Sequence, residues 1–364
     1  MVIRAFITHK QAELFTDCQD RFGVNPDTKS IAVSDGMGST WQQKIWAQLL
    51  VETFIGSTDW YPSREAIKPL CKKWRANVSD FIQNLKDTNA PENMVYRNER
   101  NLAEGRSAGA TFIGIRFNGN KWDGVVLGDS CLIEWDGIEA KFHTSQDVEA
   151  FDSYPDYFDS DESKEGKGAP KSIEGIVSEG KKLLLVSDPF SDFLLKHKKQ
   201  GNMVSYIQQL LSLSSHEDFE SLVYKWRKEG MHNDDTTLVI AENDNSEILT
   251  ISHNDNIVEM IEKEKLSPNA FGKITEDKTT PKRNSFQGGK VDVGNFVGVQ
   301  DNKKNFVDEF LTEYKRCLQK KFPKQMSKLK FKWTKKAAEE AFHILLEKYS
   351  LSKNSSYHAI THNS

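Results

Sequence analysis

The feature that most constrains the fold is a set of short apolar runs, each with an acidic patch at one end. The runs have the length and composition of β-strands and cover residues 30–33, 124–127, 183–186 and 237–240. The patches beside them are Ser34-Asp35-Gly36-Met37-Gly38, Gly128-Asp129-Ser130, Val186-Ser187-Asp188 and Asn233-Asp234-Asp235-Thr236. A carboxylate at a strand end is held rigidly and still reaches water, so we expect these groups to converge on one site.

Converging carboxylates make an oxygen-rich site, and this donor set suits Mg²⁺ or Mn²⁺ rather than zinc or copper. Two such cations about 4 Å apart can share a bridging water and lower its pKa towards neutrality. The same cations neutralise the oxygens of a phosphate ester, which favours hydrolysis of phosphomonoesters. Any single patch is ordinary turn chemistry, so the prediction depends on the patches as a set.

The remaining pattern predicts an α+β protein with antiparallel strands. Apolar alternation indicates strands over residues 2–8, 30–34, 110–117, 121–127, 131–135, 182–187 and 236–242. Helical periodicity indicates helices over residues 40–54, 64–85, 190–198, 204–213 and 217–228. The turns Asn118-Gly119-Asn120 and Asp136-Gly137 are typical of hairpins, which favours a meander over alternating βαβ units.

Together with two further motifs, the acidic patches follow one another in a characteristic order. The series reads Gln19-Asp20, Asp35-Gly36-Met37-Gly38, Gly109-Ala110-Thr111, Gly128-Asp129-Ser130, Ser187-Asp188 and Asp234-Asp235-Thr236-Thr237. As a set, over about residues 1–243, it resembles the metal-dependent serine/threonine protein phosphatases of the type 2C (PPM) family, in particular the bacterial members. The resemblance implies a four-layer α-β-β-α sandwich of two antiparallel sheets flanked by helices. It also implies hydrolysis of phosphoserine and phosphothreonine in proteins by a metal-bridged hydroxide.

Carried over position by position, the resemblance implies two or three Mg²⁺ or Mn²⁺ ions and a role for each site residue. Asp35 would bridge both principal metals, and Gly36 would bind through its carbonyl. Asp20 would belong to the metal site by orienting metal-bound waters, so Asp35 and Asp20 are the expected catalytic residues. The other expected metal ligands are Asp188 and Asp234 for the first metal and Asp129 for a third.

Three departures from the family pattern support a rival interpretation. Gln19 precedes the early aspartate, Pro189 follows Asp188, and Phe15 occupies the approximate place of a phosphate-binding arginine, with Arg4, His9 and Lys10 as nearby substitutes. The rival is a catalytically weak or inactive phosphatase fold that docks a phosphoprotein or a signalling partner. Retention of all five aspartates favours the enzyme, because a pure scaffold gains nothing from clustered, mutually repelling carboxylates.

Charge and composition divide the chain into parts. We predict a phosphatase domain over residues 1–245, a linker over 246–304, a basic helical region over 305–349 and a disordered tail over 350–364. The formal net charge of the chain is −4, whereas residues 303–348 contain 13 Lys or Arg against 6 Asp or Glu. This asymmetry suggests a protein partner for the basic helices, and nucleic acid is the less favoured alternative.

The sequence indicates a cytoplasmic protein without a membrane span. The apolar part of the first residues is too short for a secretory signal, and no later apolar run has the length of a transmembrane helix. The four cysteines are scattered, as expected for reduced thiols. The expected partners are a phosphoprotein substrate and, upstream of it, a serine/threonine kinase.

Overall fold

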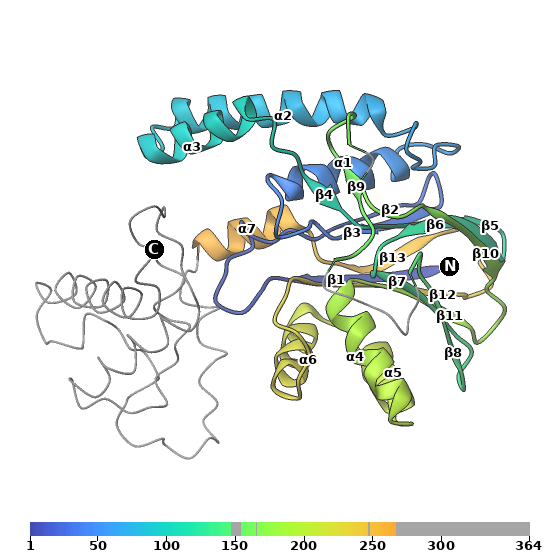
Figure 1. Cartoon of the computed structure of the whole chain (residues 1–364). Helices are drawn as coiled ribbons and strands as arrows, with labels where there is room; N and C mark the ends of the chain where they lie inside the picture. The colour runs from blue at the N-terminus through green and yellow to red at the C-terminus, as the bar shows by residue number, and fades with distance from the viewer. Residues whose placement is uncertain (147–153, 165, 247, 267–364) are drawn as a thin grey trace, which may run out of the picture. The chain divides into compact units, whose positions relative to one another are not determined.

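A computed structural model of the chain describes residues 1–146, 154–164, 166–246 and 248–266, and it confirms the predicted α+β sandwich. Two β-sheets pack face to face, and helices cover both outer sides (Figure 1). None of the described helices combines the length and the apolar character that a membrane crossing requires. The predicted helical region 305–349 and tail 350–364 lie outside the described residues.

The first sheet has six strands in the order β13-β1-β12-β11-β7-β8. Their bounds are β13 (Thr250–Asn254), β1 (Val2–Thr8), β12 (Thr236–Glu242), β11 (Lys182–Val186), β7 (Cys131–Trp135) and β8 (Ala140–His143). Every neighbouring pair in it is antiparallel except β1 and β13, which run parallel. The predicted antiparallel architecture is confirmed, and the one parallel pair is an addition at the edge of this sheet.

The second sheet is antiparallel throughout and has five strands in the order β10-β6-β5-β3-β2. Their bounds are β10 (Lys171–Ile176), β6 (Lys121–Leu127), β5 (Phe112–Asn118), β3 (Ser30–Ser34) and β2 (Arg21–Asn25). The predicted Asn118-Gly119-Asn120 turn joins β5 to β6, with Gly119 at a φ of +62°. A short pair, β4 (Gly109–Ala110) with β9 (Phe158–Asp159), lies beside this sheet.

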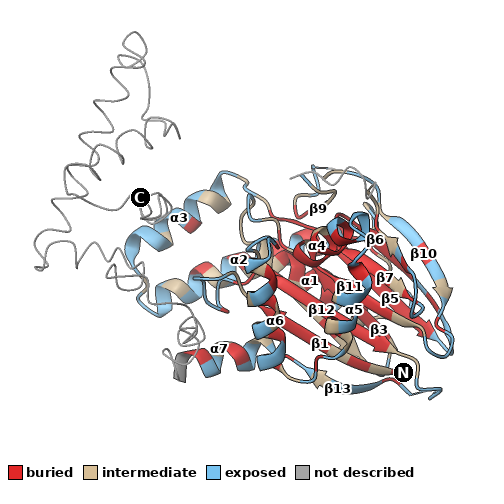
Figure 2. Ribbon diagram, turned by 90° about the horizontal axis from the view of Figure 1, so that it is seen from below, coloured by how far each residue is buried: buried red, intermediate tan, exposed pale blue. Residues whose placement is uncertain are grey.

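Alternation along the strands builds three apolar layers. In β11, Leu183 and Leu185 face the other sheet, whereas Leu184 and Val186 face the outer helices. Because both faces of this strand are covered, its sequence is a continuous apolar run. The central strands accordingly form the buried centre of Figure 2, whereas the edge strands β10 and β13 are largely exposed.

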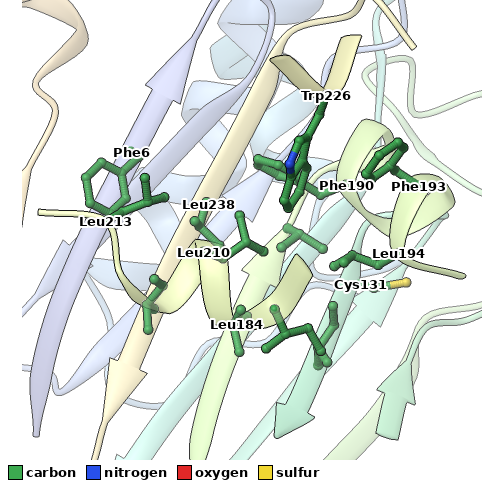
Figure 3. Close-up of a cluster of buried hydrophobic side chains, with 14 of the residues drawn as sticks. Phe6, Cys131, Leu184, Phe190, Phe193, Leu194, Leu210, Leu213, Trp226 and Leu238 are labelled. Carbon is green, nitrogen blue, oxygen red and sulfur yellow. The ribbon is translucent and has the colours of Figure 1, made fainter. Parts of the chain in front are cut away.

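Helices cover the outer faces through apolar stripes. On the six-stranded sheet lie α4 (Asp188–Lys199), α5 (Met203–Leu211) and α6 (His216–Lys228). On the five-stranded sheet lies α1 (Gln43–Ile55), α2 (Lys68–Asp87) packs on the outer side of α1, and α3 (Glu92–Ala103) packs against α2. Figure 3 shows Phe190 and Phe193 of α4 beside Trp226 of α6, at ring-centroid distances of 5.5 and 5.1 Å.

The folded region extends beyond the predicted boundary at residue 245. Within the segment 246–304 that was expected to be a linker, the structure places β13 and the helix α7 (Ile257–Leu266). The linker prediction is thus wrong at least up to residue 266. The sequence pattern that would predict β13 is weak, because four of its five residues are exposed. The strand also lies at a sheet edge, where alternation of apolar residues is not needed.

The buried carboxylate of Asp255 attaches this additional segment to the rest of the fold. Its Oδ2 accepts hydrogen bonds from the backbone N–H of Ile7 at 3.0 Å and from Nδ1 of His216 at 2.9 Å. Its Oδ1 is 2.9 Å from Nε2 of His253. Burial by itself lowers the pKa of His216, but hydrogen bonds to Asp255 and Glu220 outweigh burial and raise the pKa to about 9.

The raised pKa of His216 makes the stability of the fold pH-dependent. Because the folded chain binds this proton more tightly than the unfolded chain, the contribution is complete below pH 6.5 and is lost as the pH rises through 9. We expect the free energy of unfolding to fall by about 3 kcal/mol over this interval. Urea unfolding across pH 6 to 10 measures it, and His216→Gln removes this component. An equal slope in the variant would contradict the assignment.

Candidate active site

The predicted site residues meet at one end of the sandwich, where they line a pocket of about 430 Å³. Asp35 follows β3, Asp129 lies between β6 and β7, Asp188 follows β11, and Asp234 precedes β12. The pocket is lined by these four aspartates and by Gly36. The fifth aspartate, Asp20, does not line the pocket but is fully buried near Asp35.

The loop that carries Asp35 is fixed by hydrogen bonds to the neighbouring strand. The backbone N–H of Asp35 donates to Oγ1 of Thr111 at 3.2 Å, and the N–H of Thr111 donates to the Asp35 carbonyl at 2.9 Å. At Gly36 a Cβ atom would stand 3.0 Å from the carbonyl oxygen of Gln19 and 2.9 Å from Cγ of Gln43. Glycine is needed here because these two segments approach so closely.

Asp188 begins a helix rather than a loop, and this explains the proline that follows it. Helix α4 starts at Asp188, and Pro189 lies in its first turn. Backbone N–H groups in that turn have no partner within the helix, so proline loses nothing there. The carboxylate of Asp188 also lies at the positive end of the helix dipole. The hydroxyl of Ser191 donates to the Asp129 carbonyl at 2.8 Å, which connects this helix to the Asp129 turn.

Asp20 is held by the strand that follows Asp234. The hydroxyl of Thr237 donates to Oδ2 of Asp20 at 2.7 Å, and the backbone N–H of Thr237 donates to Oγ of Ser187 at 2.9 Å. Hydrogen bonds thus connect the segments around residues 20, 187 and 237, although they are far apart in the sequence.

Crowding of the carboxylates raises their pKa values. Burial and the charge of Asp235 raise the pKa of Asp20 to about 7, even though Thr237 opposes the rise. Burial, followed by the charges of Asp20 and Asp188, raises the pKa of Asp35 well above its usual range. Burial and the charge of Asp129 do the same for Asp188. Cations at this position would remove the repulsion.

Two buried oxygens provide a test of whether a cation suits the site. Oδ1 of Asp20 and Oδ1 of Asp188 are buried and have no hydrogen-bond partner among the described residues. A buried carboxylate oxygen without a partner is costly, and a hard divalent cation is a suitable partner for it. No three His, Cys, Asp or Glu side chains of the described segments form a ready-made metal cage. Carboxylate oxygens are ligands that suit Mg²⁺, an ion that keeps several of its own waters.

Lys10 does not line the pocket, but its ammonium group pairs with one of the aspartates that do. Its Nζ lies 2.9 Å from Oδ1 of Asp234, and the charges of Asp234 and Asp235 raise its pKa against the effect of burial. Arg4 instead binds Glu242 and the Leu211 carbonyl, and His9 packs its ring against Phe15. Of the three substitutes considered for the missing arginine, only Lys10 contacts a site residue.

Sequence reasoning missed two further pocket residues, Asp192 and His232. Burial raises the pKa of Asp192, and the charge of His232 acts in the opposite direction. Asp192 follows Asp188 by four residues on one helix, so both lie on the same face. This spacing was the available signal for Asp192. No comparable pattern marks His232, which lies in the irregular turn before β12.

Asp235 has a structural role that the motif alone did not reveal. Its Oδ1 accepts the backbone N–H of Lys10 at 2.9 Å, and its Oδ2 accepts that of Gln19 at 2.7 Å. Arg227 of α6 donates to the carbonyl oxygens of Asp234 at 2.6 Å and of His9 at 3.1 Å. These bonds hold the loop of residues 9–19 against the pocket.

Two side chains with reactive chemistry, the thiol of Cys131 and the imidazole of His143, have surroundings that do not suit a catalytic role. The thiol of Cys131 is fully buried, and burial together with the charge of Asp129 raises its pKa, so it is not a thiolate nucleophile. His143 lies in β8 and is 2.9 Å from Glu134, and it does not line the pocket.

The sequence profile described as "Protein phosphatase 2C" matches residues 9–226. A search of curated protein sequences found no match. Solved structures with a similar fold include a bacterial serine phosphatase (14% identity, 66% of this chain and 96% of that chain, TM-score 0.42).

Two other similar structures are serine/threonine phosphatases of named bacteria. One is PstP/Ppp of Mycobacterium tuberculosis (17% identity, 66% of this chain and 97% of that chain, TM-score 0.41). The other is the S. agalactiae serine/threonine phosphatase (14% identity, 66% of this chain and 99% of that chain, TM-score 0.42). The profile match covers more than half of the sequence. The chain therefore belongs to the protein phosphatase 2C family, whose members are metal-dependent serine/threonine phosphatases.

Proposed function

We propose that this protein hydrolyses phosphoserine and phosphothreonine in proteins and that the reaction requires Mg²⁺ or Mn²⁺. The observation that carries the proposal is the convergence of Asp35, Asp129, Asp188 and Asp234 at one pocket, with Asp20 buried beside Asp35 and two buried carboxylate oxygens left without a partner. The carboxylates of this cluster repel one another, and cations bound among them during function would relieve the repulsion.

The residues that would hold the cations are those predicted from the sequence. Asp35, the carbonyl of Gly36, Asp188 and Asp234 would bind two ions, and Asp129 would serve a third. When bound, such cations lower the pKa of water and neutralise the oxygens of a phosphate ester. Asp20, buried and held by Thr237, orients the surrounding hydrogen bonds and is not exposed to substrate.

Other groups of the chain would bind the substrate. The ammonium group of Lys10 stays protonated, since its pKa is raised, and it supplies positive charge beside Asp234 for the phosphate group. His232 lines the same pocket and offers a ring nitrogen to the substrate. Lys10 also neutralises Asp234. An ammonium group and a carboxylate therefore lie next to each other where the phosphate would enter.

The rival interpretation, a phosphatase fold that only docks phosphoproteins, loses part of its motivation. Pro189 is accommodated in the first turn of α4, and the backbone of Gln19 is tied to Asp235. Lys10 supplies a cation where the expected arginine is missing. The departures from the family pattern therefore have local structural explanations that leave the site intact.

The test is hydrolysis of a phosphothreonine peptide by the full chain with Mn²⁺, with Mg²⁺ and with EDTA. We expect turnover with either cation, at least a hundredfold loss with EDTA, and recovery when the cation is restored. The melting temperature should also rise with Mn²⁺, because a ligand of the folded state stabilises it. A folded chain that neither binds Mn²⁺ nor hydrolyses the peptide would support the docking interpretation instead.

The partners and the domain limits follow from the same proposal. A serine/threonine kinase must supply the phosphoprotein substrate. We place the end of the catalytic unit after α7 rather than at residue 245, because β13 and α7 are bonded to β1 and the loop of residues 9–19. The basic region 305–349 remains the proposed docking segment for a protein partner.

A further inference from the structure

A second cavity, of about 810 Å³, lies beside the active-site pocket. Both are lined by Gln19, and the chain passes from one to the other between Ser39 and Thr40. The side-chain oxygen of Gln19 would lie 3.4 Å from a Cβ at Gly38, so this side chain stands at the border. We call this cavity, between the 13–19 loop, the start of α1, and α3, the flank groove.

The two walls of the flank groove carry different charges. The wall that leads to the active-site pocket contributes Glu13 and Asp17. The opposite wall is formed by α3 and the residues that follow it. It contributes Arg97, Arg100 and Arg106, and we call it the arginine wall. Because Lys44 lies beside Asp17, the wall next to the pocket is of mixed charge, and an acidic ligand is attracted mainly to the arginine wall.

The arginine wall has more positive charge than its own carboxylates neutralise. Arg100 and Arg106 share one partner, Glu104, with Nε–Oε distances of 2.7 and 3.6 Å. Arg97 forms no ion pair with any described residue and is exposed. Exposed guanidinium groups in this arrangement can form charge-assisted hydrogen bonds with carboxylates of a ligand.

The floor of the flank groove is fixed by a polar network and by the packing of Trp41 on Trp74. Asn98, the only α3 residue that is buried, accepts hydrogen bonds through Oδ1 from Trp41 Nε1 at 3.1 Å and from Gln42 Nε2 at 3.0 Å. Gln42 has a left-handed backbone with a φ of +55°, just before α1 begins. The arginine wall is thereby held at a set position relative to the Asp35 loop.

We propose that the flank groove binds the substrate segment beside the phosphorylated residue and selects segments with acidic side chains several residues away from it. This inference rests on the proposed phosphatase function, since the phosphate in the pocket would position the segment. The occupant is an extended, acidic stretch of a phosphoprotein. Charge complementarity to Arg97, Arg100 and Arg106 and continuity with the pocket at Gln19 identify it.

The test compares two phosphothreonine peptides of equal length with the full chain and Mn²⁺. One peptide carries Asp residues several positions from the phosphothreonine on both sides, and the other carries Asn at the same positions. The variant is Arg97→Glu combined with Arg106→Glu. The control is Arg75→Glu, which reverses an exposed charge on α2 outside the groove. Para-nitrophenyl phosphate serves as a substrate too small to reach the groove.

We expect the natural chain to show a KM about tenfold lower for the Asp peptide, with similar kcat. The double variant should lose this preference, while Arg75→Glu keeps it and the small substrate is hydrolysed equally by all three. The preference should shrink at high salt, because exposed charges are screened. Equal KM values for the two peptides, or a preference that persists in the double variant, would overturn the proposal.

Fluorescence anisotropy with the unphosphorylated peptides separates this inference from the proposed function. If the chain hydrolyses nothing but binds the Asp peptide more tightly, and the double variant does not, the phosphatase proposal fails and the groove proposal stands. If the chain hydrolyses phosphopeptides but treats Asp and Asn peptides alike in both assays, only the groove proposal fails.

Discussion

Asp35→Asn is expected to lower kcat for a phosphothreonine peptide by about a thousandfold. Asp35 is buried among the other acidic side chains: burial raises its pKa most, and the charges of Asp20, Asp188, Asp129 and Asp234 raise it further. An amide has nearly the same shape but removes one negative charge and one anionic oxygen from the site. The measurement is steady-state hydrolysis with saturating Mn²⁺, and the matched control is Asp80→Asn on the exposed surface of α2.

The same substitution should have the opposite effect on stability when cations are removed. Because the pKa of Asp35 is raised in the folded chain, ionising it above its unfolded pKa costs stability, and asparagine removes that cost. We expect the variant in EDTA to be more stable than the natural chain by about 1 kcal/mol near neutral pH. Activity and cation-free stability thus change in opposite directions. Loss of both would indicate misfolding rather than loss of a ligand.

Asp255→Ala should cause the largest loss of stability among single substitutions outside the active site. The change leaves the buried N–H of Ile7 and the ring of His216 without their partner, and it removes the bond to His253. Removing one member of such a buried charged pair costs about 3 to 5 kcal/mol. Urea unfolding measures the loss, which Asp255→Asn should reduce because its amide oxygen still accepts one hydrogen bond.

Glu259→Ala provides the control for this prediction, since Glu259 lies in α7 but is exposed. A loss of less than 1 kcal/mol in Asp255→Ala would mean that β13 and α7 do not stabilise the rest of the fold.

The hydrogen bond from Phe15 N–H to Glu264 Oε2 at 3.0 Å predicts a further effect. Because Glu264 of α7 holds the 9–19 loop, Asp255→Ala should also impair the position of Lys10.

The parts of the fold that were predicted correctly are those with strong periodic signals. The run Leu183–Val186 is apolar on both faces, and Asp188 follows directly, so strand and site could be located together. The strand β13 was missed because its side chains are mostly exposed and its parallel pairing with β1 depends on residues nearly 250 positions apart. No pattern within the strand itself records such a long-range contact.

The candidate site was predicted as a set of aspartates, and its supporting groups were not. Each aspartate occupies a strand or helix end that can be recognised locally. Lys10 and Asp235 acquire their roles only when the 9–19 loop folds against the turn before β12. His232 reaches the pocket from an irregular turn, where neither helical nor strand spacing applies. Pro189 was interpreted as a departure from the family pattern because the sequence did not indicate that a helix begins at Asp188.

The position of β1 between β12 and β13 bears on how the protein acquires activity during synthesis. Strand β1 is synthesised long before residues 236–254, so neither of its neighbours exists when it leaves the ribosome. Closing so long a loop is entropically costly and slow compared with local pairing. The 9–19 loop and Lys10 follow directly after β1, so they reach their final places only after nearly all described residues have emerged. A nascent chain would therefore remain unable to act on phosphoproteins until the catalytic unit is complete.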